Sequence, residues 1–253
     1  MREVLRLEEI SLTYQAKNGE VAALQDFSLT ACEGELIAIV GPSGCGKSTL
    51  LSIIAGLEAP TRGGVYLYGQ PISGVSDKIG YMLQKDNLLA WRTIRSNVLL
   101  GLEIRGMLTD ENTRYADSLL ETYGLAAFAD KYPSQLSGGM RQRAALIRTL
   151  ATRPGLLLLD EAFSALDYQT RVTVTDDVCH ILRSVGKTAI IVTHDIPEAI
   201  SMAERVVVLS RRPGRLKSIH NIELGSTPPL ERRADHRFAG YFNAIWKELD
   251  VHA

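Results

Sequence analysis

A glycine-rich loop that ends in a lysine and a hydroxyl residue has the residue types and spacing to bind phosphate. It fits the spacing GxxxxGK[ST] and lies between the apolar run Leu36 to Val40, expected to be a buried strand, and a helix expected from Lys47 to Ala55. Glycines let backbone N–H groups turn toward phosphate oxygens, and a helix start adds unpaired N–H groups. We therefore expect a bound nucleotide, with Lys47 at its β- and γ-phosphates and the Ser48 hydroxyl on Mg²⁺. The expected binding residues are Gly41, Pro42, Ser43, Gly44, Cys45, Gly46, Lys47, Ser48 and Thr49.

Cys45 lies inside this loop, close to the start of the expected helix. A helix N-terminus and the neighbouring Lys47 are expected to stabilise its thiolate. We expect alkylation of Cys45 to block nucleotide binding, and bound nucleotide to protect the thiol.

Two adjacent carboxylates form the second chemical feature. The apolar run Leu156 to Leu159 ends in Asp160 and Glu161, and a buried strand delivers such side chains to its carboxyl end, where ligands bind in α/β sheets. Asp160 is expected to hold Mg²⁺ directly or through water, and Glu161 to polarise an attacking water. Acids that only cap the strand are the alternative. A glutamate directly after the aspartate favours hydrolysis over transfer to another substrate.

The elements that position these residues alternate between strand and helix patterns. Residues 3 to 30 predict antiparallel strands with a turn at Lys17-Asn18-Gly19, and residues 94 to 150 have helical periodicity. Strand patterns interrupted by helices imply a parallel sheet, and the long helical stretch implies an inserted subdomain. Further strands are expected at Leu156 to Leu159, Thr188 to Thr193 and Arg205 to Leu209, and helices at about 167 to 184 and 197 to 204.

The segment Leu136-Ser137-Gly138-Gly139-Met140 resembles the signature sequence of ABC ATPases. A helix is expected after it, so Ser137, Gly138 and Gly139 offer a second anion-binding helix start. The resemblance implies that two copies join head to tail, each signature covering the ATP on the other copy's phosphate loop. Met140 departs from the glutamine usual there, which puts a polar contact from that position in doubt.

Four further residues each resemble a single functional residue of the family. Gln84 resembles the glutamine that senses Mg²⁺ and water, and Asp167 lies in a loop that resembles the one crossing the dimer interface. His194 resembles the histidine that contacts the γ-phosphate, and Tyr14 the aromatic that stacks on adenine. The alternative for Gln84 is a solvated loop residue. For His194 it is a histidine that only caps the strand, and for Tyr14 it is an aromatic of the core.

The resemblance covers about residues 4 to 225 and implies an α/β fold. This fold is a P-loop NTPase (ABC ATPase) core with a parallel sheet, an N-terminal antiparallel β subdomain and a helical subdomain insertion. The expected domains are 1–225, with the helical subdomain at about 94–150, and a short helical extension at 226–253. The implied cofactors are ATP and Mg²⁺. Catalysis is assigned to Glu161, His194, Lys47 and Gln84, and the metal to Ser48, Gln84 and Asp160.

The segments around Trp91 and Gly101 to Gly106 resemble the branch that imports nitrate, aliphatic sulfonates, taurine or similar solutes. The implied partners are a second copy, transmembrane permease subunits and, indirectly, an extracytoplasmic solute-binding protein, with the chain peripheral on the cytoplasmic face of the cell membrane. The rivals are a soluble non-transport ABC ATPase in DNA repair or translation, an exporter motor and a non-catalytic regulatory cassette.

Composition agrees with this class. The chain has 253 residues with 45 % apolar residues, and its net charge of −1 argues against a nucleic-acid partner held by bulk charge. Three cysteines without a CxxC pair favour a reducing compartment. No segment reads as a secretory signal or approaches the roughly 20 apolar residues of a membrane span.

Several surface candidates stay open. Trp91 is either a core aromatic or a contact for a membrane subunit. An aromatic stripe at helical spacing is expected to pack on the chain's own body, with a partner contact as the alternative. Solvated surface is favoured over lipid contact for Arg2, Arg211, Arg212 and Arg215. The stripe comprises Phe238, Tyr241, Phe242, Ile245, Trp246 and Leu249.

Overall fold

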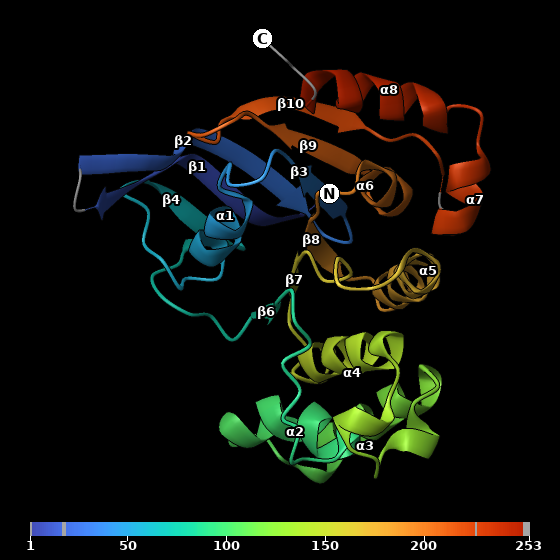
Figure 1. Cartoon of the computed structure of the whole chain (residues 1–253). Helices are drawn as coiled ribbons and strands as arrows, with labels where there is room; N and C mark the ends of the chain where they lie inside the picture. The colour runs from blue at the N-terminus through green and yellow to red at the C-terminus, as the bar shows by residue number, and fades with distance from the viewer. Residues whose placement is uncertain (1, 17–18, 226, 250–253) are drawn as a thin grey trace.

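The computed structural model describes residues 2–16, 19–225 and 227–249. Two sheets lie above a group of helices in Figure 1. The strands are β1 (Glu3–Ala16), β2 (Gly19–Cys32), β3 (Leu36–Val40), β4 (Arg62–Leu67), β5 (Gln70–Pro71), β6 (Ile79–Met82), β7 (Leu156–Asp160), β8 (Thr188–Val192), β9 (Arg205–Leu209) and β10 (Leu216–Asn221). The α-helices are α1 (Lys47–Ile54), α2 (Ile94–Ile104), α3 (Asp110–Thr122), α4 (Gly138–Ala151), α5 (Tyr168–Ser184), α6 (Ile196–Met202), α7 (Pro229–Ala234) and α8 (Phe238–Leu249). Two short 3₁₀ helices span Ala126–Phe128 and Pro133–Gln135.

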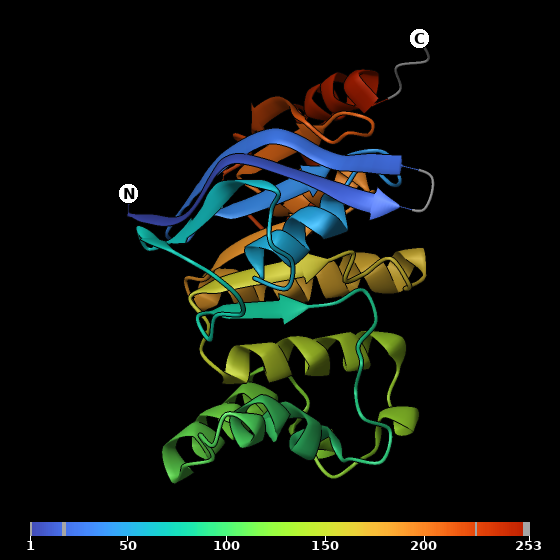
Figure 2. The same cartoon turned by 90° about the vertical axis from the view of Figure 1, so that its left-hand side faces the viewer.

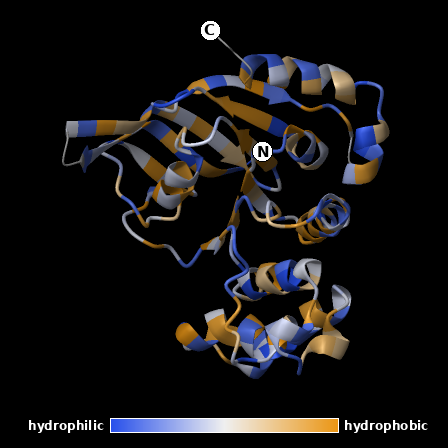
Figure 3. Cartoon of the chain, in the orientation of Figure 1, coloured by the Kyte–Doolittle hydropathy of each residue, from blue (hydrophilic) through white to orange (hydrophobic). Residues whose placement is uncertain are grey.

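The larger sheet has the strand order β10-β9-β3-β8-β7-β6. Its strands from β9 to β6 pair in parallel, and β10 is antiparallel to β9. Every residue of β3, β7 and β8 is buried, as expected for strands covered on both faces, and Figure 3 shows β9 as largely hydrophobic. Ile37 and Ile39 face the core shared with α1, whereas Ala38 and Val40 face the core shared with α6 and α8. The predicted parallel sheet is confirmed.

The smaller sheet is antiparallel, with the order β2-β1-β4-β5. Its apolar positions alternate, and Ile10 and Phe27, partners across β1 and β2, are both fully buried. The two antiparallel strands predicted for residues 3 to 30 are confirmed. The predicted turn at Lys17-Asn18-Gly19 falls mainly on residues 17 and 18, which lie outside the described residues.

The helical group α2 to α4 is inserted between β6 and β7, which are neighbours in the larger sheet. Figure 2 shows it below the sheets, with its two connections to β6 and β7 at opposite ends of these parallel strands. Thr93, Thr109 and Ser137 cap the three helices, because each side chain accepts a hydrogen bond from a backbone N–H of the first turn. The predicted helical stretch is confirmed.

The aromatic stripe packs on the chain's own body, as predicted. Ile245 of α8 is fully buried in the core of α6 and β9, and most of the stripe is partly buried against it. Trp246 is the exception: 49 % of it is exposed, and its ring stacks on Phe242. The domain boundary at residue 225 stays a prediction. Within the described residues, no helix combines the length and apolarity that crossing a membrane requires.

Candidate functional site

A cleft of about 470 Å³ lies where the phosphate loop, β7, β8 and the smaller sheet meet. It is lined by side chains from segments far apart in the sequence. Most of the predicted catalytic and nucleotide-contacting side chains are therefore gathered in one place. The lining residues are Tyr14, Ala23, Ser43, Gly44, Gly46, Lys47, Ser48, Thr49, Glu161, His194 and Arg212.

The phosphate loop leads from β3 into α1 through two left-handed glycines, Gly44 (φ 72°) and Gly46 (φ 106°). A Cβ on Gly46 would lie 2.8 Å from Leu24, so this position needs glycine for its space as well as its conformation. The Lys47 ammonium donates hydrogen bonds to the carbonyls of Gly41 (2.8 Å) and Pro42 (3.1 Å). Lys47 is only 6 % exposed, so a positive charge lies at the floor of the cleft.

Ser48 and Asp160 form a pair of oxygen ligands at this floor. The Ser48 hydroxyl donates to Asp160 Oδ1 at 3.0 Å, and the Tyr81 hydroxyl donates to Asp160 Oδ2 at 3.2 Å. Burial raises the pKa of Asp160, while the two hydroxyls oppose that shift. Burial and the nearby Asp160 raise the pKa of Tyr81, so this residue stays a proton donor.

Hydroxyl and carboxylate oxygens suit Mg²⁺, which keeps several waters and takes few protein ligands. The described residues contain no group of three or more His, Cys, Asp or Glu side chains able to hold a metal by themselves. The Ser48–Asp160 pair therefore fits a metal that is bound jointly with nucleotide phosphates.

Glu161 follows β7 with a left-handed backbone (φ 45°), fixed by its N–H bond to the Val192 carbonyl at 2.8 Å. His194 Nδ1 lies 3.2 Å from Glu161 Oε2, and Gln84 Nε2 donates to the same oxygen at 3.5 Å. Gln84 also donates to the Ser164 hydroxyl at 3.1 Å. The structure thus brings three of the four predicted catalytic side chains into contact, which argues against Gln84 as a merely solvated residue.

Tyr14 is partly buried: it packs against the core shared by the smaller sheet and α1, and it also lines the cleft. Its hydroxyl donates to Glu58 Oε2 at 2.7 Å, which anchors the ring beside the start of α1. Burial, then the hydrogen bond to Glu58, raises the pKa of Tyr14. An anchored aromatic at the rim fits a stacking role for a base.

The signature residues lie outside the cleft of their own chain. Ser137 caps α4 by accepting from Met140 N at 3.3 Å, and Asp167 caps α5 by accepting from Thr170 N at 3.1 Å. Gly139 must be small, because a Cβ there would lie 2.9 Å from Val174. Ser137, Gly138, Gly139 and Asp167 do not line this cleft. Any nucleotide that they contact therefore has to be bound to another molecule.

The prediction that Cys45 is present as a stabilised thiolate is wrong. Its side chain is 1 % exposed and packs in the core below the loop, with Sγ close to the backbone of Gly41. Burial raises the pKa of this thiol, and the opposing effect of Lys47 is smaller. The thiolate is therefore disfavoured, and only the backbone of Cys45 contributes to the loop.

Three further residues at the site were not predicted from the sequence. The Tyr81 hydroxyl donates to Asp160, and Glu58 accepts the hydrogen bond of Tyr14. Arg212 lines the cleft itself. The sequence favoured a solvated surface for Arg212 and did not predict its place in the cleft. Trp91 is 74 % exposed, so the core alternative for it is wrong.

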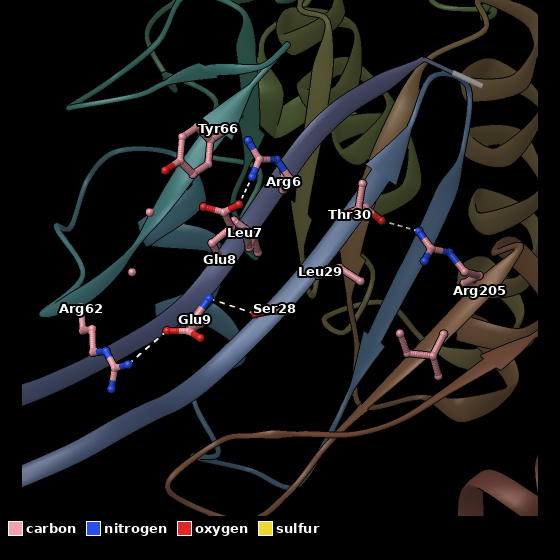
Figure 4. Close-up of a pocket in the computed structure, with 13 residues that line it drawn as sticks. Arg6, Leu7, Glu8, Glu9, Ser28, Leu29, Thr30, Arg62, Tyr66 and Arg205 are labelled. Carbon is pink, nitrogen blue, oxygen red and sulfur yellow. Dashed lines mark hydrogen bonds and ion pairs between the residues drawn. The ribbon is translucent and has the colours of Figure 1, made fainter.

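A larger cavity of about 810 Å³ lies on the smaller sheet, away from this cleft (Figure 4). Its cations are matched by acids: Arg6 pairs with Glu8, and Arg62 with Glu9. Arg205 pairs with Glu35, which does not line the cavity and is not drawn in Figure 4. The charged side chains of this cavity are thus paired, and no phosphate-binding loop lines it, so we assign the chemistry to the cleft of about 470 Å³.

The phosphate loop, the two strand-end acids and the doubly covered parallel sheet define a P-loop ATPase. The family model described as ABC transporter matches residues 24–164. The chain is 46 % identical to the uncharacterized ABC transporter ATP-binding protein YtlC of Bacillus subtilis, covering 97 % of this chain and 95 % of that protein. It is 38 % identical to the taurine import ATP-binding protein TauB of Roseobacter denitrificans, covering 96 % and 94 %.

Solved structures agree. The dimeric, post-hydrolysis ATP-binding cassette MJ0796 bound to ADP and Pi is similar with a TM-score of 0.73 and 34 % identity, covering 87 % of this chain and 99 % of that one. The chain belongs to the ABC transporter family, and it is an ATP-binding cassette that hydrolyses ATP. The predicted α/β core with its antiparallel and helical subdomains is thereby confirmed.

Proposed function

We propose that the chain is the motor subunit of an ABC importer that takes up a small anionic solute, such as taurine, an aliphatic sulfonate or nitrate, through separate membrane subunits. The observation that carries this proposal is the similarity to TauB over nearly the whole of both chains. YtlC, at higher identity, has a name without a substrate, so the solute itself rests on TauB alone.

The side chains divide the chemistry among them. Lys47 binds the β- and γ-phosphates, and Ser48, Asp160 and Gln84 would hold Mg²⁺, which would supply charge neutralisation there. Glu161 orients the attacking water and accepts its proton, and His194 contacts the γ-phosphate while holding Glu161 in place. The 3.2 Å contact between His194 and Glu161 supports this division.

We propose that hydrolysis requires a second copy. Ser137, Gly138, Gly139 and Asp167 lie outside their own cleft, and a head-to-tail dimer brings them to the partner's nucleotide. The dimeric state of MJ0796 supports this arrangement. Binding of ATP then closes the dimer, and hydrolysis opens it.

We propose that the permease binds next to the segment after Gln84. Trp91, 74 % exposed, is a large aromatic of the kind that dominates protein interfaces, and it follows Gln84 by seven positions. The same chain segment therefore joins the cleft to this surface. Such docking places the chain at the cytoplasmic face of the membrane, and the solute-binding protein contacts only the permease.

The test is to express tagged Glu161→Gln protein in its source cell and to identify proteins that copurify from solubilised membranes with ATP present. A multispanning permease together with a solute-binding protein is the expected result, and ligand screening of that binding protein then names the solute. Trp91→Ala is the matched control, which should lose the permease but retain ATP. Recovery of soluble partners or nucleic acid alone would overturn the importer and favour a non-transport ABC ATPase.

A further inference from the structure

The loop between β9 and β10, residues 210–215, is built against the nucleotide cleft. The Gly214 N–H donates to the Ala23 carbonyl at 2.9 Å, and the Gln25 N–H donates to the Gly214 carbonyl at 3.0 Å. A Cβ on Gly214 would lie 2.1 Å from the carbonyl oxygen of Cys45, so the loop contacts the phosphate loop directly. The two loops therefore have a fixed relative position.

Internal hydrogen bonds give the loop its shape. The Ser210 hydroxyl donates to the Pro213 carbonyl at 3.1 Å and accepts from the Arg215 N–H at 2.9 Å. Arg215 donates to Gln25 Oε1 at 2.5 Å, which ties the loop to β2 a second time. Arg211 and Arg215 line a separate cavity behind the phosphate loop, and Arg212 alone of the three lines the cleft.

Arg212 is placed at the Tyr14 end of this cleft. Its Nε donates to the Ala22 carbonyl at 3.2 Å, and Ala22 pairs with Thr13 across β1 and β2, next to Tyr14. Lys47, Ser48 and Glu161 line the same cleft, and Ser48 is bonded to Asp160 at the end of β7. Among the described residues, no carboxylate forms an ion pair with Arg212, in contrast to Arg6, Arg62 and Arg205. An arginine keeps its charge at any physiological pH, so the cleft holds an uncompensated cation.

We propose that Arg212 is a nucleotide-binding residue whose guanidinium donates to the α-phosphate of the bound nucleotide. Lys47 serves the β- and γ-phosphates, so the two cations divide the charge of one ligand along the cleft. The α-phosphate is the phosphate nearest the base, and a base stacked on Tyr14 puts it on the side that Arg212 occupies. The inference rests on the nucleotide site proposed above and does not depend on the importer.

The test measures equilibrium binding of ATP, GTP and CTP to Arg212→Gln, Arg212→Lys and the control Arg211→Gln. Arg212→Gln should weaken ATP binding about tenfold at low salt, equivalent to about 1.4 kcal/mol, and less at high salt because ions screen the contact. Arg212→Lys should recover part of the loss, and Arg211→Gln should stay within twofold of the unmodified chain. The fold-loss should be equal for the three nucleotides, because all share the α-phosphate.

Two results would overturn the assignment. A change below twofold in Arg212→Gln removes Arg212 from the binding site, provided that Lys47→Ala abolishes binding in the same assay. A loss confined to ATP places the guanidinium on the base instead of the phosphate. Thermal unfolding of each variant checks folding, and Arg212→Lys keeps the question answerable if the glutamine variant unfolds. If the unmodified chain does not bind nucleotide, the proposed nucleotide site is wrong. If the copurification experiment recovers no permease, the importer is contradicted but the role of Arg212 is unaffected.

Discussion

Nδ1 of His194 lies 3.2 Å from Oε2 of Glu161. The Gln84 amide donates to the same oxygen, so residues that follow β6, β7 and β8 meet at one carboxylate. These are neighbouring parallel strands, whose carboxyl ends share one edge of the sheet. Glu161 is therefore held from both sides, and a change on either neighbour alters its orientation.

Replacing Glu161 by glutamine is expected to lower the rate of ATP hydrolysis by about 10² to 10⁴-fold, the usual contribution of a general base. Binding of ATP should persist, because Lys47 and the phosphate loop are unchanged. Phosphate release and nucleotide affinity are the two measurements. His194→Ala serves for comparison and should lower the rate without abolishing binding. A Glu161→Gln rate near that of the unmodified chain would contradict the assigned role.

Tyr14 should contribute through its ring more than through its hydroxyl. Tyr14→Ala is expected to weaken ATP binding by about 1–3 kcal/mol, the usual value of base–aromatic stacking. Tyr14→Phe keeps the ring and loses only the hydrogen bond to Glu58, so its affinity should fall much less. Titration of both variants with ATP separates the effects. Equal losses would show that the anchor at Glu58, and not stacking, matters.

Cys45 should react slowly with thiol reagents in the folded chain. Of the three free cysteines, Cys32 is half-buried, whereas Cys45 and Cys179 are buried. Burial raises the pKa of Cys45, so little thiolate is present at neutral pH. Thiol titration should therefore give a fast reaction at Cys32 and release the others on unfolding, with Cys32→Ser as control. Rapid modification of Cys45 at pH 7 would restore the reactive-thiolate hypothesis.

Glu198 should make stability depend on pH. This carboxyl on α6 is 2 % exposed, and burial, then the neighbouring Asp195, raises its pKa to about 7 from the model-compound value of 4.5. Thr193, Arg171 and Arg233 face it and oppose the shift. The folded state binds the proton more tightly, so the stabilisation is complete below pH 4.5 and is lost as pH rises through about 7.

The free energy of unfolding should therefore fall by about 3 kcal/mol between those limits, relative to Glu198→Gln. Urea unfolding at pH 5, 6, 7 and 8.5 measures it in both proteins. Parallel pH profiles for the two would mean that Glu198 is ionised in the folded state throughout.

Local patterns predicted most of this architecture. The phosphate loop, the acids after β7 and the core strands could be predicted because a buried strand is a continuous apolar run, and because a phosphate-binding turn needs glycines at fixed spacing. The strand β10 was missed: in its sequence Leu-Lys-Ser-Ile-His-Asn the two apolar residues are three positions apart, so the alternation typical of a half-buried strand is lacking.

Long-range contacts could not be predicted in this way. Arg212 reaches the cleft only because Gly214 packs against the phosphate loop, about 170 residues earlier in the chain. The burial of Cys45 depends likewise on the core beneath it, and its position beside a helix start gave the opposite expectation. The sequence correctly indicated that Lys47 favours the Cys45 thiolate, but burial has the larger effect on the pKa of this thiol.

The helical insertion leaves the sheet at β6 and returns at β7, two neighbouring strands at one edge. Because β6 and β7 are parallel, the insertion leaves from the carboxyl end of β6 and returns at the amino end of β7, so its two attachments lie at opposite ends of this strand pair. A displacement of the group α2 to α4 would therefore act on both ends of β6 and β7, whereas β3, which leads into the phosphate loop, is separated from β7 by β8. Because Gln84 lies in the outgoing attachment, such a displacement would also alter its contact with Glu161. The position of the helical group and the orientation of Glu161 are therefore linked through one chain segment.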